Sequence, residues 1–204
     1  YEIPFGATVE VVESDANDAD KFNTTNAVDD GSATESKTAS GIAYVDGETS
    51  ETNGHSVAFT NERKTVAINL KKILVDSFAD ADKEFYFTAE LTGVAGNDQT
   101  PKTARITVEN GEGELENAFK GLPIGATVTI TEINTDGSQS LDKYTTTSAV
   151  DVPAITATGR EISFVVPSST ATVTFTNTRK DVQLKITKKF ERSEEHTSEL
   201  QSRS

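Results

Sequence analysis

Three polar residues stand where the apolar face of a predicted strand would place a buried side chain: Lys72, Glu132 and Asn177. Successive side chains of a strand point to opposite faces, so residues two positions apart share a face. The apolar residues that precede the three at this spacing are, in turn, Ile68 and Leu70, Val128 and Ile130, and Val173 and Phe175. A lysine, a glutamate and an asparagine are therefore predicted on the inner faces of three strands.

Each of these residues, taken alone, has an ordinary explanation. A lysine at a strand end can extend its amine to solvent, and an asparagine there is commonly a turn or bulge residue. A buried Lys–Glu ion pair is another possibility, although desolvation makes such a pair a poor source of stability. The combination of the three is more specific, because it contains the groups that autocatalytic amide formation requires.

That chemistry would join Lys72 to Asn177 with the help of Glu132. Burial lowers the pKa of a lysine, so Lys72 could become a neutral nucleophilic amine. Burial also favours the protonated form of Glu132, which could polarise the Asn177 side-chain carbonyl and shuttle protons. Attack on that carbonyl would release ammonia and leave a neutral amide. The folded core would hold the reactants together, and each domain would react once, so no turnover enzyme is expected.

The same pattern recurs along the chain, which indicates an internal repeat. Residues 3–13 resemble residues 122–132, residues 56–64 resemble 172–180, and residues 66–72 resemble 182–188. We therefore expect the C-terminal half of one repeat in residues 1–64, a complete repeat in 65–180, and the start of a third in 181–191. The positions equivalent to the three polar residues are Glu13, Asn61 and Lys188.

The elements that must position these residues are predicted to be short strands. Thr and Val recur in alternating runs separated by Gly, Asn, Asp and Ser, which is typical of an antiparallel β-sandwich. Strands are expected near residues 66–75, 84–91, 103–108, 114–119, 126–133, 143–148, 160–166 and 171–178. Turns are expected at residues 80–83, 96–99 and 136–138.

Composition excludes several classes of function. The chain has 33 acidic and 19 basic residues and a net charge of -14, which argues against a nucleic-acid partner. It lacks cysteine and has only two histidines, so no disulfide, metal or cofactor is expected. The acidic stretch at residues 15–20 lacks the spacing of a calcium loop. No apolar run is long enough to span a membrane, and the absence of an initiating Met or signal peptide indicates an internal fragment.

The C-terminal residues are expected not to be native. Residues 192–202 match, codon by codon, the conceptual translation of a common sequencing-library adapter. A charged helical tail is the alternative interpretation, but agreement over such a length is improbable by chance. Residues 192–204 are therefore set aside as a probable adapter translation in predicting fold and function.

The motifs in the predicted complete repeat resemble those of the B-type repeat domains of Gram-positive collagen adhesins and related pilin domains. They are Leu-Lys-Lys at 70–72, Leu-Pro-Ile-Gly at 122–125, Thr-Glu at 131–132, Phe-Thr-Asn at 175–177 and the strand-like stretch 82–87. The resemblance implies tandem immunoglobulin-like β-sandwiches, one complete and two partial, each with an intramolecular Lys–Asn isopeptide bond between its first and last strands.

Carried onto this sequence, the resemblance implies that Lys72 bonds to Asn177 with Glu132 assisting. Lys71 adjoins Lys72, and a β-bulge could exchange them, although the phase of the strand favours Lys72. Glu13 and Asn61 would serve the preceding repeat, and Lys188 the following one.

The resemblance also implies an extracellular location on the bacterial cell wall. The expected function is a structural stalk or spacer of a cell-wall-anchored adhesin or pilin-like protein, with neighbouring repeats of the chain as partners and host surfaces contacted through other domains. The alternative is a ligand-binding module that itself recognises host matrix or glycan. A covalent link between terminal strands would carry pulling force and restrict the unfolded chain, as a disulfide does, without being reducible.

Overall fold

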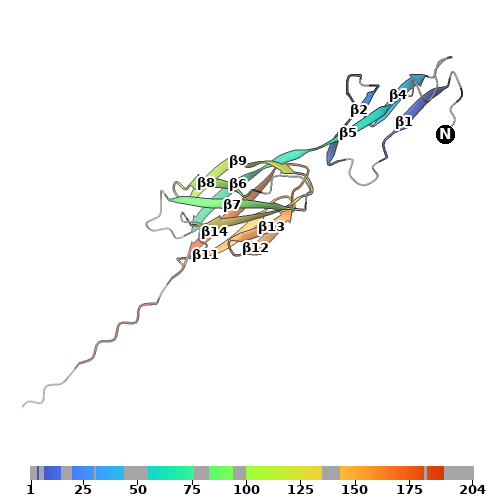
Figure 1. Ribbon diagram of the computed structural model, residues 1–204. Helices are drawn as coiled ribbons and strands as arrows, with labels where there is room; N and C mark the ends of the chain where they lie inside the picture. Colours follow the sequence, from blue (N-terminus) through green and yellow to red (C-terminus); the bar gives the residue numbers. More distant parts are fainter. Residues whose placement is uncertain are drawn as a thin grey trace, which may run out of the picture.

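The computed structural model describes residues 4, 7–14, 20–29, 31–43, 55–75, 83–93, 100–134, 143–181 and 183–190, with the side chains of residues 42 and 43 left aside. Every regular element in these residues is a β-strand (Figure 1). None of the described residues forms a helix of the length and hydropathy that crossing a bilayer requires.

Residues 65–179 form two sheets that face each other. The strands among the described residues of this range are β6 (Thr65–Val75), β7 (Glu84–Thr92), β8 (Lys102–Thr107), β9 (Glu112–Pro123), β10 (Thr127–Ile133), β11 (Tyr144–Val150), β12 (Ile155–Thr158), β13 (Glu161–Val165) and β14 (Ala171–Arg179). One sheet has the order β13-β10-β7-β8 and the other β12-β11-β14-β6-β9. The predicted all-β, immunoglobulin-like sandwich is confirmed.

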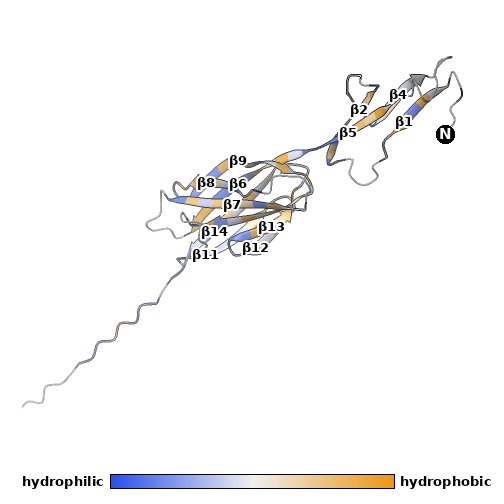
Figure 2. Cartoon of the chain, viewed as in Figure 1, coloured by the Kyte–Doolittle hydropathy of each residue, from blue (hydrophilic) through white to orange (hydrophobic). Residues whose placement is uncertain are grey.

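The core lies between the two sheets and is built by side chains that alternate along the strands. Inward residues such as Leu70, Val128 and Val173 are fully buried, whereas their neighbours in sequence point outward. The rings of Phe87 and Phe175 approach across the core with centroids 5.1 Å apart. Figure 2 shows hydrophobic and hydrophilic positions interleaved along single strands, as two-sheet packing requires.

The first and last strands of the sandwich lie side by side. β6 and β14 pair in parallel, with Lys72 opposite Phe175 and Leu74 opposite Asn177, whereas the other ladders of the sandwich are antiparallel. β6 is an interior strand of its sheet, between β14 and β9.

The N-terminal region contains β1 (Thr8–Val12), β2 (Phe22–Val28), β3 (Thr34–Glu35), β4 (Thr38–Ala43) and β5 (Val57–Arg63). The order β3-β2-β5 repeats β12-β11-β14, and the pair β1-β4 repeats β10-β13. Within described residues 7–63, no strands correspond to β6 through β9. This region thus has the strand pairing of the second half of the sandwich.

The two regions are joined directly, because β5 ends at Arg63 and β6 begins at Thr65 (Figure 1). The backbone N–H of Ile124 donates to the carbonyl of Lys64 at 3.0 Å, and Arg63 Nη1 donates to the Ile124 carbonyl at 2.6 Å. Lys64 N–H also donates to the Lys21 carbonyl at 2.8 Å. The connection is therefore hydrogen-bonded on both sides.

The eight strands expected in residues 65–180 are all present, with boundaries shifted by a few residues. β12 was not expected, since its residues are mostly exposed and give little apolar alternation. β9 continues to Pro123, which an edge strand tolerates. The turns expected at 96–99 and 136–138 lie outside the described residues, as does the turn at 80–83 except for its last residue.

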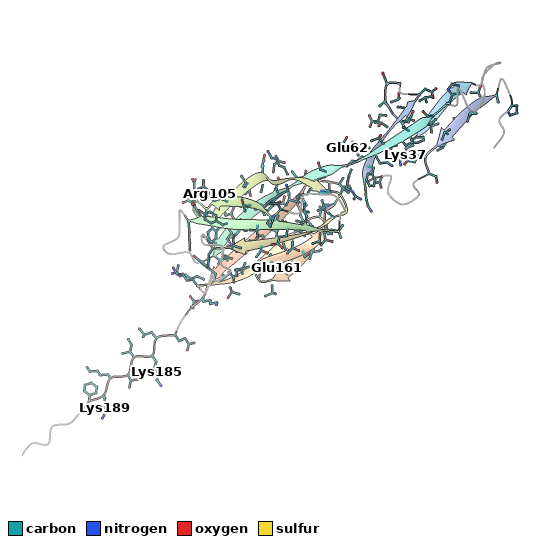
Figure 3. All side chains as sticks on the ribbon, viewed as in Figure 1. Lys37, Glu62, Arg105, Glu161, Lys185 and Lys189 are labelled. Atoms are coloured by element: carbon teal, nitrogen blue, oxygen red, sulfur yellow. The ribbon has the colours of Figure 1, made fainter. Side chains whose placement is uncertain are left out.

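Residues 183–190 extend away from the sandwich without forming a strand (Figure 1). Leu184 and Ile186, which match core positions of β6 in sequence, are 84% and 82% exposed. Lys185 and Lys189 project from this segment in Figure 3. The same figure shows Arg105 and Glu161 on the outside of the sandwich, as expected for its charged residues.

Candidate functional site

Lys72, Glu132 and Asn177 meet inside the sandwich. Lys72 Nζ lies 3.0 Å from Glu132 Oε1, and Asn177 Nδ2 donates to the same oxygen at 2.8 Å. All three side chains are 0% exposed. A single carboxylate oxygen therefore contacts both the amine of the lysine and the amide nitrogen of the asparagine.

Strand register brings these groups together. Lys72 comes from β6 and Asn177 from β14, neighbouring strands of one sheet, while Glu132 comes from β10 in the facing sheet. Asn177 lies two residues beyond Phe175, the parallel partner of Lys72, and so shares its inward face. The carboxyl group thus reaches across the core to the point where the first and last strands run together.

Burial changes the acid–base behaviour of Lys72. Desolvation lowers its pKa to about 8, and the opposing effect of the Glu132 charge only partly offsets that shift. The amine also lies 4.7 Å from the centroid of the Phe85 ring. Apart from its 3.0 Å ion pair with Glu132 Oε1, Lys72 Nζ has no hydrogen-bond partner in the described part of the chain, and neither has Glu132 Oε2.

The neighbouring Lys71 lies on the opposite face of β6. Its Nζ pairs with Glu114 at 2.8 Å and with Glu112 at 3.4 Å on β9, and the side chain is partly exposed. The hydrogen bond that Lys71 Nζ donates to Glu114 raises the pKa of Lys71. Of the two adjacent lysines, Lys72 is the one beside Glu132.

Thr146 is a fourth member of the cluster, and sequence reasoning missed it. Its Oγ1 donates to Asn177 Oδ1 at 2.7 Å, and the side chain is 6% exposed. Thr146 lies on β11 directly opposite Asn177 in the antiparallel register. The signal that could have revealed it is the likeness of Lys-Tyr-Thr-Thr-Thr at 143–147 to Lys-Phe-Asn-Thr-Thr at 21–25.

The N-terminal region holds a second cluster of the same kind. Asn61 Nδ2 donates to Glu13 Oε1 at 2.7 Å, and Thr24 Oγ1 donates to Asn61 Oδ1 at 2.6 Å. Thr24 is the direct cross-strand partner of Asn61, as Thr146 is of Asn177. Unlike Asn177, however, Asn61 is exposed.

The remaining predicted residue, Lys188, lies in the extended C-terminal segment. Its side chain is exposed, and its Nζ lies 4.4 Å from the centroid of the Phe190 ring. The structure therefore brings Glu13 and Asn61 together, and Lys72, Glu132 and Asn177 together, but it does not bring Lys188 to either cluster. In the part of the chain that the structure describes, no group of three or more His, Cys, Asp or Glu residues is arranged to hold a metal ion.

Solved structures to which the chain is similar include proteins of bacterial pili. The major pilin T3.2 of Streptococcus pyogenes is 19% identical, with 87% of this chain and 69% of that chain covered and a TM-score of 0.46. A second Streptococcus pyogenes major pilin is 18% identical, with 88% and 72% covered and a TM-score of 0.45. A pilus-presented adhesin (Cpa) is 19% identical over 56% of this chain and 28% of its own, with a TM-score of 0.36.

No curated protein matches the sequence at a significant level. A protein-family model does match, over residues 68–180, and is described as a domain of unknown function (DUF5979). The matched span includes all four residues of the buried cluster and more than half of the chain. The chain belongs to the DUF5979 family.

Proposed function

We propose that the sandwich of residues 65–180 cross-links itself through an amide between Lys72 and Asn177, with Glu132 assisting. We further propose that the chain serves as a structural stalk or spacer of a bacterial surface protein of the adhesin or pilin-like kind. The observation that carries the proposal is the single buried oxygen, Glu132 Oε1, in contact with both Lys72 Nζ and Asn177 Nδ2.

The proposed reaction needs no external reagent. The lone pair of Lys72 Nζ attacks Asn177 Cγ, and the bond from Cγ to Nδ2 breaks. Glu132 takes a proton from the attacking nitrogen and gives one to the leaving nitrogen, so ammonia departs and the carboxyl group is unchanged overall. With a pKa of about 8, the Lys72 amine would be neutral in roughly a tenth of the molecules at pH 7, and this neutral form is the nucleophile.

The cost of the starting arrangement favours the product. A lysine ammonium buried with incomplete hydrogen bonding is destabilising, and an ion pair in the core seldom repays its desolvation. Conversion to an amide removes the amine charge from the core and releases the Asn177 Nδ2 nitrogen as ammonia. Folding would therefore drive the cross-link, because only the folded core holds the groups in contact.

The position of the bond suits a load-bearing element. The bond would connect β6 with β14, the first and last strands of the sandwich, so tension entering one strand would leave through the other. It would also close a loop of about 100 residues, for which restriction of the unfolded chain contributes about 4 to 5 kcal/mol. The direct passage of β5 into β6 would transmit the load between successive regions.

Intact mass spectrometry of the folded full-length chain tests the cross-link. The expected mass is lower than the sequence mass by one ammonia, and peptide mapping should join the segment containing Lys72 to that containing Asn177. A Glu132→Gln variant, which keeps an oxygen acceptor but loses the proton relay, should retain the full mass. A folded wild-type chain with the unmodified mass would contradict the proposal.

The stalk role has a separate test. Force spectroscopy on the chain pulled from its two ends should show no extension from residues between Lys72 and Asn177, whereas the Lys72→Met variant should extend fully. Full extension of a cross-linked wild-type chain would exclude a load-bearing role for the bond.

A further inference from the structure

We propose that Thr146 is a catalytic residue of the amide formation, whose hydroxyl stabilises the negative charge that develops on Asn177 Oδ1. This inference rests on the proposed function, because it assigns a role within the same reaction. Nothing in the residue types alone distinguishes this threonine from the many others in the chain.

The geometry is that of an oxyanion donor. In the ground state Thr146 Oγ1 donates to Asn177 Oδ1 at 2.7 Å, so the hydroxyl already lies beside the oxygen on which negative charge develops. Both residues are buried, and water is therefore kept from competing for the oxygen. Because the two residues are direct partners in the β11–β14 ladder, the sheet holds the hydroxyl in place before reaction.

The contacts divide the work between Thr146 and Glu132. Sequence reasoning gave Glu132 two tasks, polarising the carbonyl and moving protons. In the structure, Glu132 Oε1 contacts the two nitrogens, Lys72 Nζ and Asn177 Nδ2, whereas the carbonyl oxygen receives its hydrogen bond from Thr146. The carboxylate is thus placed for proton relay, and the hydroxyl for charge stabilisation.

The electron and proton balance follows this division. When Lys72 Nζ attacks Asn177 Cγ, the carbonyl electron pair moves to Oδ1, where the Thr146 hydroxyl stabilises it without giving up its proton. Glu132 then carries a proton from the attacking nitrogen to Nδ2. The electron pair returns to re-form the carbonyl as ammonia leaves, and Thr146 ends unchanged.

The N-terminal cluster supports the assignment independently. There Thr24 Oγ1 donates to Asn61 Oδ1, and Asn61 Nδ2 donates to Glu13, in the same order as in the sandwich. This arrangement forms in a region whose described residues contain no counterpart of β6. The threonine and glutamate therefore orient the asparagine amide in advance of any lysine, with the carbonyl oxygen held by the hydroxyl.

A purely structural role would be to satisfy the hydrogen-bonding capacity of a buried asparagine. The two roles differ in kinetics, so the test measures the rate of ammonia loss by intact mass at successive times after a pulse of cell-free synthesis of the full chain. Thr146→Val, nearly isosteric but without the hydroxyl, should slow the loss about 10²- to 10³-fold. Thr146→Ser should react within a few-fold of wild type.

A second pair of variants keeps the test valid if the valine variant folds poorly. Thr146→Ser and Thr146→Ala differ by one oxygen atom, and the alanine variant should be slowed about as much as the valine variant. Rates are taken only on the folded fraction, isolated by size exclusion, and Lys72→Met serves as the unreactive control.

The outcomes separate this inference from the proposed function. Wild-type rates in the valine and alanine variants, or an equally slow serine variant, would overturn the role of Thr146 while leaving the amide intact. Absence of ammonia loss from the folded wild type would overturn both. Ammonia loss that persists in Lys72→Met would point to attack by another group and would also overturn both.

Discussion

The two asparagine clusters share their hydrogen bonds but not their surroundings. In both, a threonine hydroxyl holds the amide oxygen and a glutamate accepts from the amide nitrogen. In the sandwich, Glu132 and Asn177 are fully buried and Lys72 contacts the carboxylate, whereas Asn61 of the N-terminal region is exposed. The same hydrogen-bonded unit therefore forms in both regions, from one pair of neighbouring strands and a glutamate on or beside a strand of another sheet, but the asparagine is buried in only one of them.

Burial comes from strands that are distant in sequence. β6 supplies the lysine, and β7 and β8 help to form the facing sheet that covers it, so only the completed sandwich desolvates the cluster. Because desolvation is what lowers the pKa of Lys72, reactivity is expected only after the sandwich has closed. The comparison thus separates the groups that orient the asparagine from those that would make it react.

The largest loss of stability is expected when Lys72, the lysine of the buried cluster, is replaced. Lys72→Met leaves only the threonine–asparagine–glutamate unit, as in the N-terminal region, and should prevent the cross-link. The free energy of unfolding should fall by about 4 kcal/mol, since the loop restraint is lost. Urea denaturation and intact mass measure the two effects.

Lys71→Met is the matched control for that variant. Lys71 lies on the outer face, where it pairs with glutamates of β9. Its loss should leave the mass deficit intact and change the stability by no more than about 1 kcal/mol. A stability loss equal to that of Lys72→Met would show that the inner position of Lys72 does not matter.

A smaller effect should appear in the pH dependence of an unlinked sandwich. In Asn177→Ala no amide can form, and the free Lys72 amine is expected to keep the lowered pKa of about 8 that burial gives it in this chain, compared with 10.5 when exposed in the unfolded chain. Between these values the unfolded state binds more protons, so stability should rise with pH, by about 3 kcal/mol in total. Below pH 8 Lys72 is protonated in both the folded and the unfolded state, so it no longer makes the free energy of unfolding depend on pH.

The control for the pH experiment is the double variant Lys72→Met with Asn177→Ala. Other groups that titrate at alkaline pH are the same in both proteins, so the difference between their urea denaturation curves isolates Lys72. Parallel pH profiles from pH 7 to 10 would show that the lysine is not desolvated.

Sequence alone could locate three of the four cluster residues. Lys72, Glu132 and Asn177 each end a run of alternating apolar residues, and the alternation predicts that their side chains point into the core. Thr146 could not be located in this way, because it lies within three consecutive threonines, which give no alternation, and threonine is common on either face of a strand.

The difference between the two clusters was also beyond sequence reasoning. Glu13 and Asn61 occur in segments that resemble those of Glu132 and Asn177, and the local pattern predicts the same inner face for both pairs. The exposure of each side chain depends on which distant strands cover it, and Asn61 is exposed whereas Glu13 is half-buried. The division of tasks between Thr146 and Glu132 likewise depends on contacts across strands and sheets, which no single segment encodes.

A smaller loss of stability is expected when the connection between the two regions is weakened by substitution of Arg63. Arg63 donates to the Ile124 carbonyl and lies 4.6 Å from the centroid of the Phe22 ring, so it contacts both regions. Arg63→Ala should lower the free energy of unfolding by about 1 to 2 kcal/mol. Hydrogen exchange should show faster exchange of the Ile124 amide, with no change in the rate of ammonia loss. Unchanged exchange at Ile124 would mean that the arginine does not hold the junction.

The smallest effect is expected at the exposed asparagine. Asn61→Ala removes hydrogen bonds to Glu13 and Thr24 at an asparagine whose own side chain is exposed, so the free energy of unfolding should change by less than about 1 kcal/mol. The equivalent change in the sandwich, Asn177→Ala, abolishes the proposed link. It also removes the hydrogen bonds that Asn177 makes with the buried Thr146 hydroxyl and the buried Glu132 carboxyl group. Denaturation of both variants in the Lys72→Met background compares the hydrogen bonds alone. There Asn177→Ala should still cost more, because Asn177 and Glu132 are fully buried whereas Asn61 is exposed and Glu13 is half-buried. Equal costs in that background would mean that burial does not distinguish the two clusters, and the contrast between the two regions would then rest on the lysine alone.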